Sequence, residues 1–137
     1  MKILYFITTS EWGGASRYVF DLCKYEINKG NKVYLAVGSE GLLASKVRNV
    51  GGKVYIIKSV KRNISPLNDL KSIIMIRSLV KKLKPDIVHL NSSKAGVIGR
   101  LACQSIANKK FKVIFTVHGW SFTDGIPSAL KKGFIVL

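Results

Sequence analysis

Short apolar runs alternate with longer stretches of helical periodicity along this chain, and the alternation limits the folds that it can adopt. Strands separated by helices pair in parallel through right-handed crossovers, and the helices then cover both faces of the sheet. We therefore predict one α/β domain over residues 1–137, a doubly wound, mostly parallel, Rossmann-like sheet. The predicted strands are residues 3–7, 32–37, 53–57, 86–90 and 112–117, and the predicted helices are residues 14–29, 42–50, 66–84 and, from Ser92 or Ser93, to about residue 107.

The longest predicted helix, residues 66–84, follows a Ser65-Pro66 pair, in which the serine suits the N-cap and the proline suits the first helical position. A basic amphipathic helix can bind a membrane surface, but we favour packing on the sheet, with the charged side chains in solvent. The residues expected to face inward are Leu67, Leu70, Ile73, Ile74, Arg77, Val80 and Leu83, and those expected to face outward are Lys71, Lys81, Lys82 and Lys84.

The stretch SEWGGASRYVF, residues 10–20, joins the first strand to the first helix and is predicted to border an anion-binding cleft. Gly13 and Gly14 have no Cβ atoms, so a ligand can approach the backbone closely. The helix that begins beside them directs unpaired N–H groups and the positive end of its dipole into the same space, which suits a phosphate or diphosphate. The alternative is that the two glycines only make a tight turn between strand and helix.

In an open parallel sheet, ligands bind beyond the carboxyl ends of the strands, near the point where the strand order reverses. We expect this point to lie between the first and fourth strands. Three loops that are distant in sequence would then meet, namely residues 10–14, 91–94 and 118–122. The same rim should carry the basic residues Lys58, Lys61 and Arg62.

The charge of the chain is unusual, because 23 Lys and Arg residues against 7 Asp and Glu residues give a formal net charge of +16. Such a surface favours binding to nucleic acid, to an acidic membrane leaflet or to phosphorylated small molecules. The alternative is that the charge serves only to keep the protein soluble. No apolar run approaches the roughly 18 residues needed to span a bilayer. The first apolar run is too short and too β-like for a signal peptide.

A few small or reactive residues are expected to be structural. Cys23 and Cys103 have no His or Cys partner in ligand spacing, so we predict buried, reduced thiols in a cytosolic protein. Gly96 and Gly99 share one helical face and should let that helix approach its neighbours closely. His89 lies within a predicted strand and is expected to be structural.

Three segments of the chain resemble those of family 4 glycosyltransferases of the GT-B type: WGGASRYVFDL, PDIVHLNSSKAGVIGRLA and VIFTVHGWSF. They occur in the family's order and on the expected elements of its N-terminal, acceptor-binding domain, and the resemblance extends to about Ser128. It implies that a second Rossmann-like domain holds most of a nucleotide-sugar donor. It also implies transfer with retention of anomeric configuration, without a cofactor and without a metal ion.

The resemblance assigns roles to residues of the predicted cleft. His118 would lie near the transferred sugar as the catalytic residue, and a neutral imidazole can donate one hydrogen bond to a sugar hydroxyl and accept another. Gly13 and Gly14 would place N–H groups near the donor diphosphate, whose negative charge grows in the transition state. The other residues expected to bind substrate or diphosphate are Ser92, Ser93, Lys94, Gly119 and Trp120.

The resemblance also bears on partners and location. The two glutamates that such enzymes carry on the donor-binding domain have no counterpart here, and the chain ends in the apolar run GFIVL. We therefore expect an acceptor-binding half, either part of a longer protein or one subunit of a split enzyme with a C-terminal donor-binding chain. Its expected partners are a nucleotide sugar and a glycan or lipid-linked acceptor of polysaccharide biosynthesis, in the cytoplasm or on the anionic inner face of the cell membrane.

Two other functions stay open from the residues alone. A basic module could bind nucleic acid without catalysis, although no RNA-binding, helix-turn-helix or zinc pattern is visible. A dinucleotide-binding domain is a second alternative, in which Glu40 would contact a ribose. The first turn reads GGAS and not GxGxxG, which disfavours it.

Overall fold

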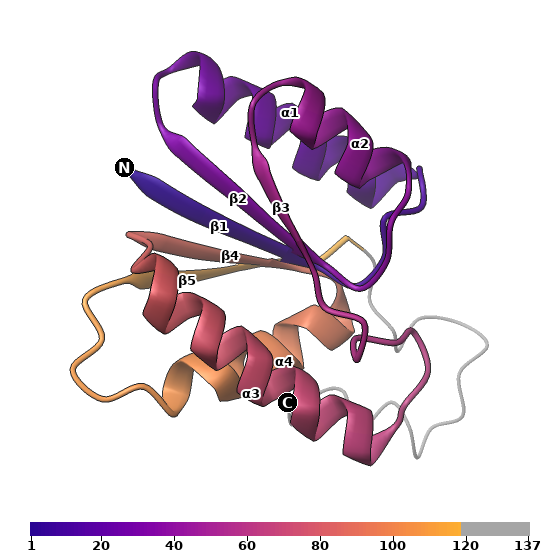
Figure 1. Ribbon diagram of the computed structural model, residues 1–137, viewed down its shortest axis with the longest axis vertical. Coiled ribbons are helices and arrows are strands. Elements are labelled where there is room, and N and C mark those ends of the chain that lie inside the picture. The colour runs from indigo at the N-terminus through magenta and orange to yellow at the C-terminus, as the bar shows by residue number, and fades with distance from the viewer. Residues whose placement is uncertain (119–137) are drawn as a thin grey trace.

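Five parallel strands form one sheet, with the order β3-β2-β1-β4-β5, in the computed structural model, which describes residues 1–118 (Figure 1). The order reverses between β1 and β4, as predicted, and the architecture is the doubly wound, Rossmann-like one. The strands are β1 (Lys2–Ile7), β2 (Lys32–Val37), β3 (Lys53–Ile56), β4 (Ile87–Asn91) and β5 (Lys112–Thr116); the helices are α1 (Gly14–Asn28), α2 (Leu42–Asn49), α3 (Pro66–Leu83) and α4 (Ser93–Gln104).

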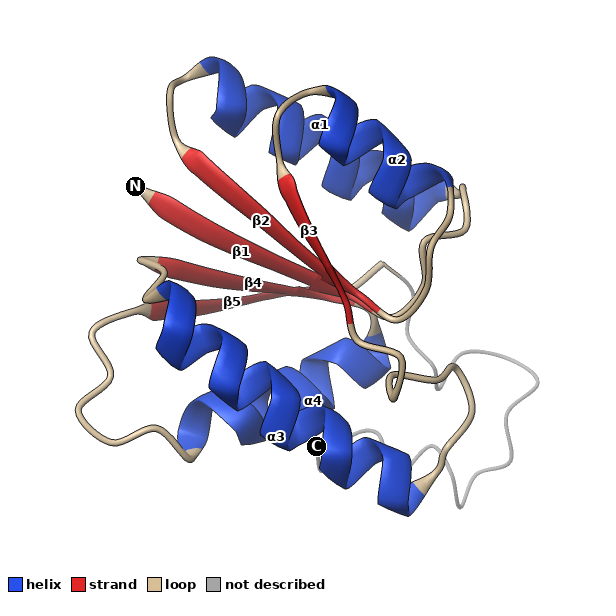
Figure 2. Ribbon diagram, in the orientation of Figure 1, coloured by secondary structure: helices blue, strands red, loops and turns tan. Residues whose placement is uncertain are grey.

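The helices form two layers, with α1 and α2 on one face of the sheet and α3 and α4 on the other (Figure 2). Successive side chains of β1 point to opposite faces, and all of them from Ile3 to Ile7 are buried. Ile3, Tyr5 and Ile7 pack in the cluster that includes α1 and α2, and Leu4 and Phe6 pack in the cluster that includes α3 and α4. Because helices cover both faces of β1, every position of the strand from Ile3 to Ile7 is apolar.

The inward face predicted for α3 is wrong for Leu67, Leu70 and Ile74, whereas Val80 and Leu83 are buried as predicted. Leu67 is 84% exposed, and Leu70 and Ile74 are each 57% exposed. An 18-residue helix is about 27 Å long, whereas a strand of five or six residues covers only about 17–20 Å, so part of the helix has no sheet beneath it. Apolar residues also occur on several sides of α3, so their spacing does not select one face. The buried residues of α3 are Ser72, Ile76, Leu79, Val80 and Leu83.

The small residues of α4 have the structural role that was predicted. A Cβ atom on Gly99 would lie 2.3 Å from a methyl carbon of Leu90, and one on Gly96 would lie 2.7 Å from the ring of Phe115. The helix ends at Gln104, three residues before the predicted end, in a turn that leads to Asn108 with φ of 53°. Strands β3 and β5 each end one residue earlier than predicted.

Cys23 and Cys103 are free and buried, as predicted, and burial raises the pKa of their thiols to about 12 and about 11. Neither thiol is therefore ionised near neutral pH. Within residues 1–118, no helix is long and apolar enough to cross a membrane, and no group of three or more His, Cys, Asp or Glu side chains could hold a metal ion. The terminal run GFIVL lies outside the described residues.

Candidate functional site

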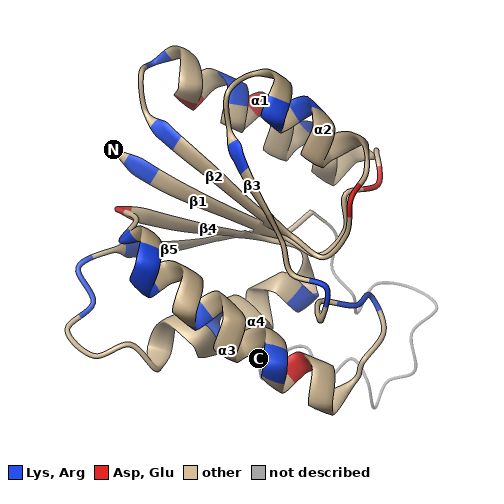
Figure 3. Cartoon of the chain, in the orientation of Figure 1, with Lys and Arg blue, Asp and Glu red and all other residues tan. Residues whose placement is uncertain are grey.

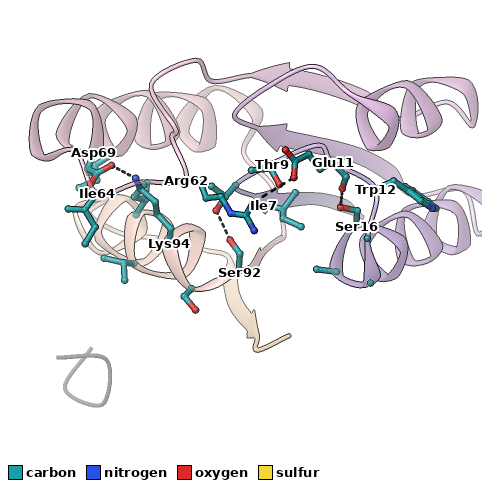
Figure 4. A pocket seen from close by; sticks show the side chains of 18 of the residues that line it. Ile7, Thr9, Glu11, Trp12, Ser16, Arg62, Ile64, Asp69, Ser92 and Lys94 are labelled. Carbon is teal, nitrogen blue, oxygen red and sulfur yellow. Dashed lines mark hydrogen bonds and ion pairs between the residues drawn. The ribbon is translucent and has the colours of Figure 1, made fainter. Parts of the chain in front are cut away.

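A cavity of about 770 Å³ lies at the carboxyl edge of the sheet, beside the point where the strand order reverses (Figure 4). It is bordered by the end of β1, the first turn of α1, the first turns of α4, and residues of the loop and helix that follow β3. Two helix N-termini therefore open toward one space, and each carries partial positive charge. Five of the residues predicted for the site line it: Gly13, Gly14, Ser92, Ser93 and Lys94.

The two glycines at the start of α1 are not required by the fold. Gly13 is the N-cap residue, and its φ of −164° is extended backbone that any residue can adopt. A Cβ atom added to Gly13 or Gly14 would meet nothing within 4 Å. The first N–H groups of α1 have no intrahelical partner, as at the start of any helix. No side chain caps them at Gly13, and the first turn of α1 holds no acidic residue that could pair with them. This geometry disfavours the alternative of a tight turn and favours close approach by an anion.

Ser92 connects the second helix terminus to the sheet. Its hydroxyl is 2.6 Å from the hydroxyl of Thr8 at the end of β1, and it also accepts a hydrogen bond from the N–H of Ala95 as the N-cap of α4. Its φ of 89° lies in a region that disfavours side chains, so these contacts hold a strained backbone at the wall of the cavity. The role of Ser92 in the structure is therefore to fix the position of α4 relative to β1.

Lys94 lines the cavity, but its charge is already partnered. Its ammonium lies 2.9 Å from the carboxylate of Asp69 on α3 and donates a hydrogen bond to the carbonyl of Asn63. The side chains of Lys94 and Asp69 are only 16% and 23% exposed, so this ion pair is largely shielded from water. Lys94 thus joins the start of α4 to α3 and to the loop before it (Figure 4).

Arg62 is the basic residue that the loop after β3 contributes to the cavity wall. Its nearest carboxylate is that of Glu11, at 3.8 Å, and both side chains are about four-fifths exposed, at 80% and 78%. A long ion pair in solvent contributes little, so Arg62 can exchange Glu11 for an anion in the cavity. Lys58 and Lys61 are exposed, as a rim position requires, but they do not line the cavity.

His118 follows β5 at the same edge of the sheet and is held by Asn91, the last residue of β4. Nε2 of His118 is 3.0 Å from Oδ1 of Asn91, and Nδ2 of Asn91 donates to the carbonyl of His89 at 3.1 Å. Because Nδ2 of Asn91 must face the carbonyl oxygen of His89, the amide oxygen of Asn91 faces His118. An amide oxygen only accepts hydrogen bonds, so Nε2 of His118 must carry the proton. Nδ1 is then the hydrogen-bond acceptor of the ring.

Contact between the rings of Tyr18 and His118 shows where His118 lies relative to Gly13 and Gly14. Tyr18 lies one turn beyond Gly14 on α1, and its ring meets the His118 ring edge to face at 4.9 Å between centroids. His118 and the glycines thus share one edge of the sheet, although the side chain of His118 is not among those that line the cavity. Gly119 and Trp120, also predicted for the site, lie outside the described residues.

The two histidines are both neutral near pH 7, because partial burial lowers the pKa of each below its ordinary value. The nearby His118 lowers the pKa of His89 further. His89 is buried in β4, with its Nε2 2.7 Å from the hydroxyl of Thr116 and its ring against Tyr5. These contacts agree with the structural role predicted for His89.

Sequence reasoning did not single out Asn91, Tyr18, Asp69 or Thr8. Asn91 carried a usable signal, because an amide at the end of a predicted buried strand must find hydrogen-bond partners. The contacts of Tyr18 and Asp69 depend on how helices pack, and no local pattern predicts them. Glu40 makes two hydrogen bonds to the guanidinium of Arg48, at 2.8 and 2.7 Å, so it is not poised for the ribose contact of the dinucleotide alternative.

The profile of the family described as Glycosyltransferase Family 4 matches residues 12–135. The chain is 43% identical over 79 residues to an Escherichia coli protein named UDP-Gal:alpha-D-GlcNAc-diphosphoundecaprenol alpha-1,3-galactosyltransferase. That alignment covers 58% of this chain and 20% of the relative, so the chain spans only a small part of that protein's length.

Solved structures show the same fold. A glycosyltransferase from Rickettsia africae superposes with a TM-score of 0.72 at 24% identity, over 97% of this chain and 33% of that one. The Anabaena protein HepE, solved in complex with UDP-glucose, superposes with a TM-score of 0.65 at 18% identity, over 88% of this chain and 30% of that one. At these identities the likeness concerns the fold alone, which is the Rossmann-like unit of GT-B proteins.

Proposed function

This chain belongs to glycosyltransferase family 4, and we propose that it forms the acceptor-binding half of a retaining enzyme that uses a nucleoside-diphosphate sugar. The proposal includes a donor-binding half, on a C-terminal domain or a separate chain, that closes over the carboxyl edge of the sheet. The name of the E. coli relative suggests UDP-galactose as donor and a sugar diphosphate on a polyprenyl lipid as acceptor.

The observation that carries the proposal is the bare backbone at Gly13 and Gly14. Neither glycine is explained by a positive φ or by a steric contact, and both face a cavity into which a second helix N-terminus also opens. Glycosyl transfer releases a nucleoside diphosphate, so N–H donors and the exposed Arg62 would stabilise the charge that develops on the leaving group. No metal ion is needed for this step.

His118 would act as a neutral hydrogen-bonding group at the transferred sugar. With its Nε2 proton committed to Asn91, the imidazole presents Nδ1 as an acceptor for a sugar hydroxyl. The partial burial that lowers its pKa keeps this acceptor available near neutral pH. The role requires the sugar to lie beside Tyr18, between the glycines and the end of β5.

A lipid-linked acceptor fits the chemistry of the cavity wall. Ile64, Val97 and Leu101 supply apolar parts of the cavity wall, whereas the N–H groups of the two helix N-termini and the guanidinium of Arg62 supply polar parts. An acceptor that carries both a sugar diphosphate and a hydrocarbon chain has the same division into polar and apolar parts.

Calorimetric titration with UDP, UDP-galactose and NAD, on this chain joined to a donor-binding half of a family member, tests the proposal at the level of binding. We expect the uridine ligands to bind more tightly than NAD, without magnesium and in the presence of a chelator. The variant Gly14→Ala should weaken UDP binding, because its methyl group would occupy the approach to the N–H groups. Preferential binding of NAD would instead support the dinucleotide alternative, and preferential binding of an oligonucleotide would support the nucleic-acid alternative.

A turnover assay tests the division into halves. The 137-residue chain alone should not transfer sugar from labelled UDP-galactose to a GlcNAc-diphospholipid, and it should do so when a donor-binding half of a family member is supplied in the same polypeptide. Replacement of His118 by Ala in that active protein should lower kcat more than it changes the UDP affinity. Efficient turnover by the isolated chain would contradict the proposal.

A further inference from the structure

The imidazole of His118 is held at two points, and the second is the ring of Tyr18. Nε2 of His118 is 3.0 Å from Oδ1 of Asn91, and the Tyr18 ring meets the imidazole at 4.9 Å between centroids and 69° between planes. The χ2 torsion of a histidine has a broad energy profile, so it does not by itself fix the ring plane. One hydrogen bond at Nε2 still lets the ring turn about the N–H···O axis. Contact with the Tyr18 ring removes that rotation.

Strand pairing and charge do not orient His118. The strand β5 ends at Thr116, so its pairing with β4 does not extend to His118, whose side chain is exposed. Figure 3 shows no Lys, Arg, Asp or Glu in β4, and residues 113–118 contain none either. Within residues 1–118, His118 takes part in no ion pair and no cation–π contact. Its orientation therefore depends on neutral contacts.

Tyr18 can fix a neighbouring ring because its own position is tied to the sheet. It lies within α1, one turn beyond Gly14, and is 38% exposed. On its buried side, its ring meets the ring of His89 at 6.4 Å between centroids and 87° between planes. His89 is buried in β4, with Nε2 2.7 Å from the hydroxyl of Thr116. The helix and the buried histidine thus hold Tyr18 in place beside His118.

The contact uses the aromatic ring of Tyr18 and not its hydroxyl group. Two rings at a steep angle attract each other because the positive edge of one meets the negative face of the other. In the part of the chain that the structure describes, the hydroxyl of Tyr18 makes no hydrogen bond. Phenylalanine keeps the ring and removes only the hydroxyl, whereas leucine is apolar without an aromatic ring. The two substitutions therefore separate the role of the ring from that of the hydroxyl.

We propose that Tyr18 is a positioning residue for His118, whose imidazole plane it fixes so that Nδ1 points in one direction toward the transferred sugar. The inference rests on the role of His118 in the proposed function and adds the residue that orients it. Asn91 determines which nitrogen carries the proton, and Tyr18 determines where the other nitrogen points. A hydrogen-bond acceptor that is misdirected at the reacting sugar lowers the rate of the chemical step.

Nuclear magnetic resonance of the 137-residue chain tests the contact without a substrate. In the unmodified chain, we expect nuclear Overhauser effects between the ring protons of Tyr18 and His118. Ring-current displacement of the His118 shifts should persist in Tyr18→Phe and disappear in Tyr18→Leu. The proton should stay on Nε2 in both variants, because Asn91 holds it there. Absence of the Overhauser effects, or a displacement that survives Tyr18→Leu, would overturn the proposal.

Turnover by this chain joined to a donor-binding half measures the consequence for catalysis. Tyr18→Leu should lower kcat about tenfold without changing the UDP affinity, and Tyr18→Phe should keep kcat within about twofold. Tyr25→Leu is the matched control, because it removes a tyrosine that is 56% exposed from the same helix, and it should leave kcat unchanged. Urea unfolding checks that each variant folds, and the unmodified chain and Tyr18→Phe decide the question if Tyr18→Leu does not.

The variant His118→Ala separates failure of this inference from failure of the proposed function. If His118→Ala lowers kcat and Tyr18→Leu does not, the positioning role is refuted and the proposed function stands. If neither substitution lowers kcat, the role proposed for His118 is contradicted and the inference falls with it. If Tyr18→Phe lowers kcat as much as Tyr18→Leu, the hydroxyl acts on the substrate directly, which also overturns a positioning role for the ring.

Discussion

The Nε2 atom of His118 lies 3.0 Å from Oδ1 of Asn91, a residue that is completely buried at the end of the neighbouring strand. The same amide donates through Nδ2 to the carbonyl of His89, so its oxygen has to face His118. A buried amide thus determines which nitrogen of a rim histidine carries the proton. The histidine itself is exposed and remains accessible to a substrate.

The first prediction concerns this tautomer. In the unmodified chain at neutral pH, we expect His118 to be neutral with the proton on Nε2, and Asn91→Asp to raise its pKa because a carboxylate favours the imidazolium. Long-range ¹⁵N–¹H correlation spectra report both properties, and the chain has only 2 histidines to assign. Thr116→Val, which removes the partner of His89, is the control and should leave the tautomer of His118 unchanged. A proton on Nδ1 would refute the assignment.

The second prediction separates ligand binding from folding at the start of α1. Gly14→Ala should leave the free energy of unfolding unchanged or raise it by up to about 1 kcal/mol, because alanine is the better helix former and its Cβ meets no neighbour. The affinity for UDP should nevertheless fall about tenfold, or about 1.4 kcal/mol. Urea unfolding and calorimetric titration measure the two quantities.

Gly30 provides the matched control for that experiment. Its φ of 85° lies in the left-handed region, so Gly30→Ala should destabilise the fold by about 1 kcal/mol without affecting UDP binding. If Gly14→Ala destabilised the fold and left UDP affinity intact, the glycines would be structural after all.

The third prediction concerns the contact between α4 and β4. Gly99→Ala should lower the free energy of unfolding by about 1–3 kcal/mol, because the new Cβ would overlap the fully buried side chain of Leu90. Leu90→Ala creates a cavity at the same place, so the double variant should be more stable than the sum of the two single effects predicts. Additive effects in thermal or urea unfolding would show that the two residues do not meet.

The fourth prediction concerns the ion pair between Lys94 and Asp69. A double-mutant cycle with Lys94→Met and Asp69→Asn should give a coupling energy of about 1 kcal/mol or more, because both side chains are largely shielded from water. The same cycle on Arg62 and Glu11, which are exposed and 3.8 Å apart, should give less than about 0.5 kcal/mol. Equal coupling in the two pairs would contradict the difference in burial.

The fifth prediction follows from the depressed pKa of the buried His89. Below its ordinary pKa of 6.5, the unfolded chain takes up a proton that the folded chain does not, so stability should fall as the pH falls toward the folded-state pKa. The contribution is at most about 1.4 kcal/mol per pH unit. Urea unfolding from about pH 5 to 7 measures this slope, which His89→Gln should reduce. A slope unchanged by the substitution would assign it to other groups.

Much of the fold could be predicted because local patterns decide it. The strand from Ile3 to Ile7 is an apolar run bounded by polar residues, and Ser65-Pro66 marks a helix start that the structure places at Pro66. The rotation of α3 could be predicted only in part, because apolar side chains lie on several of its sides and only contact with the sheet selects Ile76 and Leu79 for burial.

The sequence by itself determined the alternation of strands and helices, the edge of the sheet where a ligand would bind, and the family, since these depend on residue order and short-range periodicity. Only the tertiary structure decided which groups meet at that edge. It commits Lys94 to Asp69, assigns the proton of His118 through Asn91, and turns Leu67 and Leu70 toward solvent. The reason is that such contacts join residues far apart in the chain, and their distances are set by how the helix layers pack on the sheet.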